Sequence, residues 1–233
     1  MSATIQIQFS LRTAFRYTLD RLIRTPKNWL ALVILLLIPV AGWILLAGYL
    51  IRVLRGEDAE LHAGKELFLS GINAWGIILA YLCIPIVLLL VFKDVHTVAA
   101  LIPHYLSMTP GELFAAFPQF FREYIFYLAL GAVFALRMTL GLIQYARTGE
   151  FLYAFVLNDM YEAVERMGGW IVYALVWLGV AVPLTVITIV LLKIPVAGWI
   201  ALPVLAPFLL VVSAKFLTDL LPEPDMEDTS APE

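Results

Sequence analysis

The stretch MGGWIVYALVWLGVAVPLTVITIVLL, residues 167–192, contains no Asp, Glu, Lys or Arg. A helix needs about 20 mostly apolar residues to cross the hydrocarbon core of a bilayer, so this stretch is long enough to span a membrane. The other charge-free windows are residues 28–51, 67–92 and 194–214, and a further window, 124–146, is interrupted only by Arg137. These windows predict several membrane helices in one chain.

The composition agrees with a surface that faces lipid. Hydrophobic residues make up 62% of the chain and charged residues 14%, whereas soluble domains carry about 25% charged residues. We therefore predict an all-α fold, a polytopic integral membrane helical bundle with about five membrane-embedded segments (four to six) and two amphipathic interfacial helices. The expected single membrane domain is residues 29–217, with segments near 29–53, 72–92, 124–146, 169–192 and 194–217.

The N-terminal region, residues 1–28, is basic, because it contains only Asp20 against the bases Arg12, Arg16, Arg21, Arg24 and Lys27. Helical spacing of apolar and charged residues over 10–24 predicts a basic amphipathic helix that lies in the membrane interface and attracts anionic headgroups. A solvated helix docked on the protein's own loops is the alternative. The cluster predicts a cytoplasmic N-terminus in a multi-pass protein of the cytoplasmic membrane. Residues 147–168 form the second predicted amphipathic stretch.

Two regions are not expected to form straight membrane spans. Residues 95–121 contain Pro103, Pro110 and Pro118. Each proline removes a backbone donor, so short interfacial or re-entrant helices are expected there. The tail, residues 218–233, is acidic and contains prolines, which favours disorder.

The hexapeptide IPVAGW occurs twice, at residues 38–43 and 194–199. In each copy a proline removes a helical hydrogen bond, and a glycine three residues later permits close packing. A tryptophan follows, with an indole donor suited to a membrane interface. The repeat predicts a helix break followed by an anchor, and its candidate structural or functional residues are Pro39, Gly42, Trp43, Pro195, Gly198 and Trp199.

The two copies are expected at different depths. The second copy directly follows Lys193 and is predicted to be the turn between two spans. The first copy has two interpretations, a kink within a span or the tip of a re-entrant hairpin that returns to the cytoplasmic side. The count of basic residues favours the hairpin, whereas the long charge-free window favours the kinked span. Both interpretations stay open, as does an origin of the repeat in internal duplication.

Polar residues within or beside the apolar windows are the remaining candidates. Arg137 is costly in a membrane unless it is paired or faces a cavity, which makes it a candidate functional residue. The alternative is an arginine that snorkels to the interface from a tilted helix. Lys93, Asp94 and His96 lie together at the end of a predicted segment. They could bind a metal or relay protons, although their spacing matches no ligand signature and charges at the end of a span are ordinary.

Two stretches of the chain resemble a known family. They are IPVAGWILLAGYLIRVLRGEDAEL followed by LFLSG, within residues 38–71, and QYARTGEFLYAF, residues 144–155. The chain resembles the membrane proteins grouped as domain of unknown function 4013, which are mainly archaeal and partly bacterial. It departs from their pattern at residues 61–63, where Leu-His-Ala stands in place of a Leu-Pro and an aromatic-acidic run. The resemblance implies a polytopic helical fold and supplies no activity, ligand or catalytic residue.

The sequence offers no motif for catalysis. It contains no HExxH, nucleophile elbow or phosphate-binding loop, so we expect no enzymatic activity and no cofactor. We expect a membrane scaffold or a subunit of a membrane complex. The alternative is a small transporter or channel that uses the proline-broken helices and Arg137, and a lipid-modifying enzyme ranks third. The expected partners are the lipid bilayer and another membrane protein or a second copy of the chain, and no nucleic acid.

Overall fold

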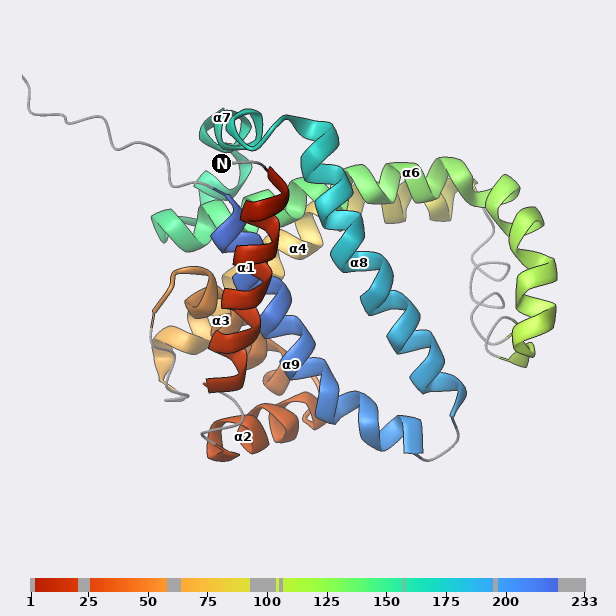
Figure 1. The fold of residues 1–233 in the computed structure, drawn as a ribbon, viewed down its shortest axis with the longest axis horizontal. Helices are drawn as coiled ribbons and strands as arrows, with labels where there is room; N and C mark the ends of the chain where they lie inside the picture. The colour runs from red at the N-terminus through yellow and green to blue at the C-terminus, as the bar shows by residue number, and fades with distance from the viewer. Residues whose placement is uncertain are drawn as a thin grey trace, which may run out of the picture.

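The structure, a computed structural model, describes residues 3–20, 26–57, 64–92, 104, 107–156, 158–194 and 197–221. The described residues form eight α-helices, one 3₁₀ helix and no strand (Figure 1). The elements are α1 (Ala3–Thr18), α2 (Pro26–Leu37), α3 (Ala41–Leu54), α4 (Lys65–Phe92), α6 (Pro110–Thr148), η2 (Phe151–Phe155), α7 (Asn158–Arg166), α8 (Trp170–Lys193) and α9 (Ala197–Leu220). The predicted all-α fold is confirmed.

Four of these helices are long and apolar enough to cross a membrane. They are α4, residues Pro118–Thr148 of α6, α8, and residues Ile200–Leu220 of α9. In α8 none of the most apolar stretch is buried within the protein. A helix that is apolar all round and still exposed needs lipid as its solvent. The fold is therefore that of a polytopic helical membrane protein.

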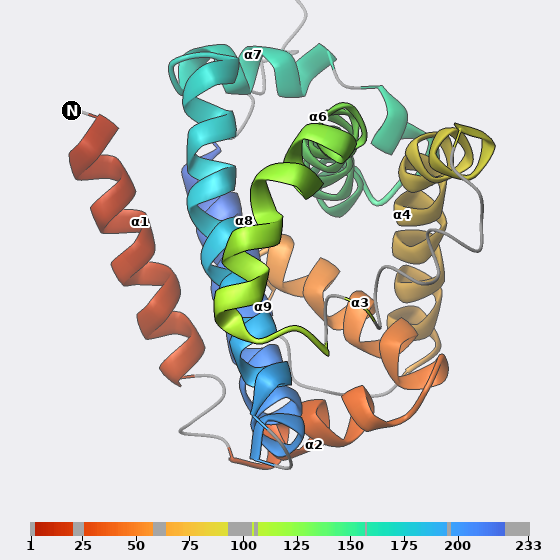
Figure 2. The ribbon, with the colours of Figure 1, turned by 90° about the vertical axis from the view of Figure 1, so that its right-hand side faces the viewer.

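The apolar segment around the first hexapeptide forms two helices. α2 has 12 residues and α3 has 14, and a rise of about 1.5 Å per residue makes both too short to cross the roughly 30 Å hydrocarbon core alone. Figure 2 shows α2 and α3 meeting in a V at the lower edge of the molecule. The break lies at residues 38–40, where the proline removes a helical hydrogen bond.

α8 and α9 form a second and longer V, joined at the second hexapeptide (Figure 1). α1 packs along α9, with the rings of Phe15 and Phe208 in an edge contact at 5.5 Å. The buried face of α1 consists of the small residues Ser10, Ala14 and Thr18. The larger apolar residues that the sequence places on one face of this helix, Leu11 and Phe15, are exposed.

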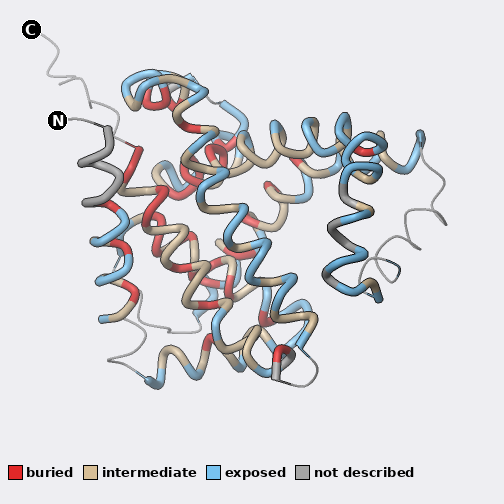
Figure 3. Tube along the Cα trace, turned by 45° about the vertical axis from the view of Figure 1, so that its right-hand side comes forward, coloured by how far each residue is buried: buried red, intermediate tan, exposed pale blue. Residues whose placement is uncertain are grey.

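The core lies where α3 crosses α4 and where the ends of α6, α7 and α9 meet. At the α3–α4 crossing, a Cβ atom on Gly48 would lie less than 3.0 Å from the carbonyl oxygen of Leu67, and one on Gly71 less than 3.0 Å from that of Ile44. The two backbones therefore touch at glycines, as in small-residue packing of membrane helices. Figure 3 shows the buried stretches on this side of the molecule, whereas α8 and much of α6 are intermediate or exposed.

Candidate functional site

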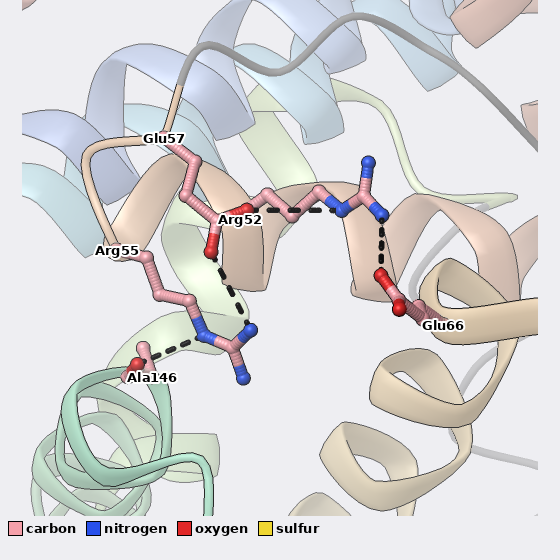
Figure 4. Close-up of polar contacts among 5 residues, drawn as sticks. All are labelled: Arg52, Arg55, Glu57, Glu66 and Ala146. Carbon is pink, nitrogen blue, oxygen red and sulfur yellow. Dashed lines mark hydrogen bonds and ion pairs between the residues drawn. The ribbon is translucent and has the colours of Figure 1, made fainter. Parts of the chain in front are cut away.

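Two arginines near the end of α3 reach toward neighbouring helix ends. The Nε of Arg55 donates a hydrogen bond of 2.9 Å to the carbonyl oxygen of Ala146 (Figure 4). Ala146 lies in the last turn of α6, where carbonyl groups have no partner within the helix and the helix dipole favours a cation. Arg55 therefore caps α6, which ends at Gly149 in the left-handed conformation with φ 75°.

Two carboxylates join this cap to the start of α4. Glu57 lies 3.5 Å from Nη1 of Arg55 and 3.9 Å from Nε of Arg52. Glu66, in the first turn of α4, lies 3.9 Å from Nη2 of Arg52 (Figure 4). Because both carboxylates are exposed, each ion pair adds little stability, and their main effect is to connect α3 with α4. We call Arg52, Arg55, Glu57, Glu66 and the carbonyl of Ala146 the arginine junction.

A second arginine cap lies beside the arginine junction. Nη2 of Arg147, at the end of α6, donates a 2.9 Å hydrogen bond to the carbonyl oxygen of Leu221, which follows α9. The neighbouring Tyr145 is buried, and its hydroxyl accepts a 3.1 Å hydrogen bond from Nδ2 of Asn73 in α4. The guanidinium of Arg55 also lies 6.0 Å from the centre of the Tyr145 ring, within cation–π range.

The arginine junction brings together the two stretches on which the family resemblance rests. Residues 52–57 come from the first stretch and residues 145–149 from the second. Their donors are directed at helix-end carbonyls and carboxylates. The arrangement can hold helix ends together, and in the described part of the chain it includes no nucleophile with a neighbouring base.

Arg137 occupies a different environment. Its side chain is exposed, and within the described part of the chain it has neither an ion-pair nor a hydrogen-bond partner. It lies one helical turn before Gly141, where a Cβ atom would be 2.6 Å from the carbonyl oxygen of Ala154 and 3.0 Å from Cε2 of Tyr81. The side chain therefore belongs to the edge of the contact between α4, α6 and η2.

The helix breaks at both hexapeptides, and the glycine of each copy makes the same close approach. A Cβ atom on Gly42 would lie less than 3.0 Å from the carbonyl oxygen of Leu35, and one on Gly198 would meet Leu191 in the same way. Seven residues separate the partners in each copy. Each glycine thus lets the second helix start directly against the last turn of the first.

The first break is strained. The backbone N–H of Ala41 donates a 2.8 Å hydrogen bond to the carbonyl of Pro39, which closes a three-residue γ-turn around Val40. Val40 has φ 63° and ψ −69°, a conformation that is rare and costly for a β-branched residue. The indole Nε1 of Trp43 donates a 3.1 Å hydrogen bond to the carbonyl of Leu36 at the end of α2. Trp43 is thus an anchor across the break.

Several candidate residues fall outside the described residues. They are Lys93, Asp94, His96 and Pro195, and for Trp199 the backbone belongs to α9 whereas the side chain is not described. The described residues contain no group of three His, Cys, Asp or Glu side chains that could hold a metal ion. The hypothesis of a metal or proton-relay site at residues 93–96 stays a prediction.

Sequence reasoning missed a charged pair in α9. Lys215 and Asp219 form an ion pair of 2.6 Å, with side chains that are only 18% and 20% exposed. Nζ of Lys215 also lies 5.5 Å from the ring centre of Tyr17 in α1. The signal was present in the sequence as a lysine followed four residues later by an aspartate. Because the charge-free window ends at residue 214, the pair falls just outside it.

Comparison with known proteins identifies the family. The sequence model of a family described as a protein of unknown function, DUF4013, matches residues 31–196. This range contains α3, α4, α6 and α8 and both stretches that meet at the arginine junction. No curated protein and no solved structure matches the chain. Because the match covers more than two thirds of the residues of the chain, the chain belongs to the DUF4013 family.

Proposed function

We propose that the protein is a scaffold or a subunit of a complex in the cytoplasmic membrane and that it carries out no catalysis. The observation that supports this role best is the open space at Gly179 on the exposed surface of α8, because an apolar surface alone also fits lipid. A row of exposed apolar residues runs along this helix at helical spacing: Ile171, Leu175, Leu178, Val182 and Ile189. We call this row the α8 stripe.

The α8 stripe has the properties of a helix-packing surface. Lipid tails are as apolar as leucine, so association of membrane helices depends on close packing rather than on hydrophobic burial. Gly179 lies beside the α8 stripe, and a Cβ atom on it would meet nothing within 4 Å. A helix of a partner protein, or of a second copy of this chain, can approach closely at this position.

The orientation that fits this role has the arginine junction on the cytoplasmic side. The contacts between helix ends support one common side for the start of α4 and the ends of α6 and α9, as four crossings require. Basic residues favour the cytoplasmic side of a membrane protein. Those near these helix ends are Arg52, Arg55, Lys65, Arg147 and Arg166.

The exposed side chains of α1 support contact with lipid. Leu11 and Phe15 are exposed beside the exposed Arg12 and Arg16, while small residues of the helix pack on α9. Apolar and basic side chains together favour binding at an interface with anionic headgroups. We therefore include an N-terminal membrane-anchoring helix in the proposal.

Co-purification tests the scaffold role. The full chain is extracted in mild detergent, and the proteins and lipids that remain bound are quantified by mass spectrometry. We expect a stoichiometric protein partner or a second copy of the chain, and its loss in Gly179→Leu, which fills the open space beside the α8 stripe. Gly131→Leu in α6 is the matched control, because its Cβ position is equally open. A monomer with no stoichiometric protein would overturn the proposal.

Cysteine labelling tests the orientation separately. In a Cys83→Ala background, Glu57→Cys is expected to resist an impermeant thiol reagent in intact cells. Gly111→Cys is expected to react, since the start of α6 lies at the opposite end of that span. Labelling of the cysteine at position 57 would reverse the proposed orientation.

A small transporter or channel is the second candidate. Arg137, an exposed cation within a candidate span, favours it, because charged residues inside membrane segments often mark a substrate path. Reconstitution in sealed vesicles tests this function. Uptake of an anion that disappears in Arg137→Gln would support a transporter, and impermeable vesicles would exclude it.

A further inference from the structure

Among the residues that the structure describes, none supplies a counter-charge to the guanidinium of Arg137. Arg137 lies eleven residues before the end of α6, about 16 Å along the helix. It is exposed, and the described part of the chain gives it no carboxylate. An arginine at the surface of a membrane span is costly unless it reaches polar groups. Those groups must then come from outside the described protein.

The neighbours of Arg137 place it close to the membrane surface. The hydroxyl of Tyr81 donates a 2.9 Å hydrogen bond to the carbonyl of Ala154 in η2. Both residues pack against Gly141, one helical turn after Arg137. η2 and α7 form the connection between the spans α6 and α8. Since such a connection lies at a membrane surface, Arg137 is within reach of lipid headgroups on that side.

Exposed apolar side chains lie on α6 and on η2, which meet at Gly141. Leu152 in η2 is 74% exposed, and Tyr153 and Phe155 beside it are also exposed. On α6, one turn before Arg137, Val133 is 51% exposed. Exposed aromatic and aliphatic side chains near a membrane surface pack against the upper parts of acyl chains. The protein thus offers a cation for a lipid headgroup and exposed apolar side chains for its acyl chains.

We propose that Arg137 binds the phosphate of a phospholipid in the leaflet next to η2 and α7, with the acyl chains of that lipid against Val133 and the exposed side chains of η2. Guanidinium groups bind phosphate through two parallel hydrogen bonds, which a lysine cannot reproduce. Lys215 needs no such ligand, because Asp219 neutralises it within the protein. The inference concerns lipid binding and is independent of a protein partner.

Lipid retention tests the proposal. The full chain is placed in nanodiscs with phosphatidylglycerol and phosphatidylcholine, then moved into mild detergent, and the lipid that stays bound is counted by native mass spectrometry. We expect one retained phospholipid for the native chain, a loss of at least about tenfold in affinity for Arg137→Gln, and a smaller loss for Arg137→Lys. Arg122→Gln, which removes another exposed arginine of α6, is expected to retain the lipid.

Four results would overturn the proposal. One is full retention of the lipid by a folded Arg137→Gln variant, with folding checked by its melting temperature in detergent. The second is an equal loss for Arg122→Gln, since the effect would then reflect general charge. The third is displacement of the lipid by millimolar inorganic phosphate, which would indicate a soluble anion as the ligand. Cross-linking of position 137 to a protein and not to a photoreactive phospholipid would assign the guanidinium to a partner's carboxylate.

Discussion

The two IPVAGW turns share one close backbone contact and differ in the helices that they join. Gly42 and Gly198 each approach the carbonyl group seven residues earlier, so in each copy the second helix starts against the last turn of the first. The first turn joins helices of 12 and 14 residues, and the second joins two helices of 24. Seven of the 14 residues of α3 are buried, whereas α8 has a single buried residue, Tyr173. The hexapeptide therefore determines where the chain turns. The length and burial of the flanking helices determine whether the resulting pair of helices packs inside the protein or faces lipid.

The largest expected effect tests whether the two turns are equivalent. Gly42→Ala and Gly198→Ala each place a methyl group against a backbone carbonyl, which cannot move without shifting the helix end. We expect the free energy of unfolding of each variant to fall by about 3 kcal/mol, which is the upper part of the usual range for overpacked sites. Thermal unfolding in detergent, followed by the loss of the monodisperse peak, measures both. Tolerance at one position and not at the other would show that the two turns differ.

The second prediction addresses the difference in packing. Gly48→Ala forces a methyl group into the backbone of α4, and we expect a loss of about 2 kcal/mol. Gly179→Ala in α8 meets nothing within 4 Å, so a gain of about 0.5 kcal/mol from the lower flexibility of alanine is expected. The same unfolding assay compares them. An equal fall in the free energy of unfolding for both variants would mean that another helix packs as closely on α8 as α4 packs on α3.

The third prediction concerns the strain in the first turn. Val40 is 68% exposed, so Val40→Gly removes little packing and relieves a backbone conformation that costs roughly 1–3 kcal/mol in a β-branched residue. After the entropy cost of glycine, about 0.5–1 kcal/mol, we expect a net gain of about 1 kcal/mol in the free energy of unfolding. Val40→Ala is the control and should give no gain, because alanine keeps the strain at positive φ. A lower free energy of unfolding for Val40→Gly would show that Val40 is not strained in a γ-turn.

The smallest effect is a pH dependence near the second turn. Nζ of Lys193, at the end of α8, donates a hydrogen bond to the carbonyl of Met108, just before α6 begins. Thr109 caps α6, and its N–H and hydroxyl donate to the carboxylate of Glu112 at 2.7 and 2.8 Å. These hydrogen bonds, with a minor contribution from the charge of Lys193, hold the pKa of Glu112 below its ordinary value of 4.5.

The sign of this dependence follows from the lowered pKa. Between the folded pKa and 4.5 the unfolded chain binds more protons, so the contribution of Glu112 is complete above pH 4.5 and is lost as the pH falls through the folded pKa. We expect the first turn of α6 to gain hydrogen exchange, corrected for intrinsic rates, as the pH falls from 5 to 3. Glu112→Gln should abolish this change. An equal change in α3 would show general acid unfolding instead.

Local patterns in the sequence predicted most of the helices. A charge-free window is a local property, and so is a proline that ends a helix, which is why the spans and the break after Leu37 were accessible from sequence alone. Whether residues 29–53 form a kinked span or a V of two short helices was harder to predict. It depends on a V that is held by tertiary contacts such as Gly48 on Leu67, and no spacing in the sequence encodes those contacts.

The candidate site was much less accessible to prediction. Arg55 and Ala146 are separated by 91 residues, and Arg147 reaches Leu221 across 74. The helix end that an arginine caps depends on how the helices pack. The sequence around Arg55 and Arg147 therefore did not indicate which carbonyl groups they would bind. Arg137 was recognised because the cost of a charge in lipid depends on residue type and segment alone. Its neighbours in η2 and α7 required the folded chain.

The cap formed by Arg147 has a consequence for how the chain is made. Leu221 leaves the ribosome after the 74 residues that follow Arg147, which takes roughly 4–15 s at usual rates of synthesis. During that interval the carbonyl of Leu221 is not yet present to accept the hydrogen bond from Arg147. The contact between the end of α6 and the end of α9 can thus form only after α9 has been synthesised, so a chain cut before α9 lacks it.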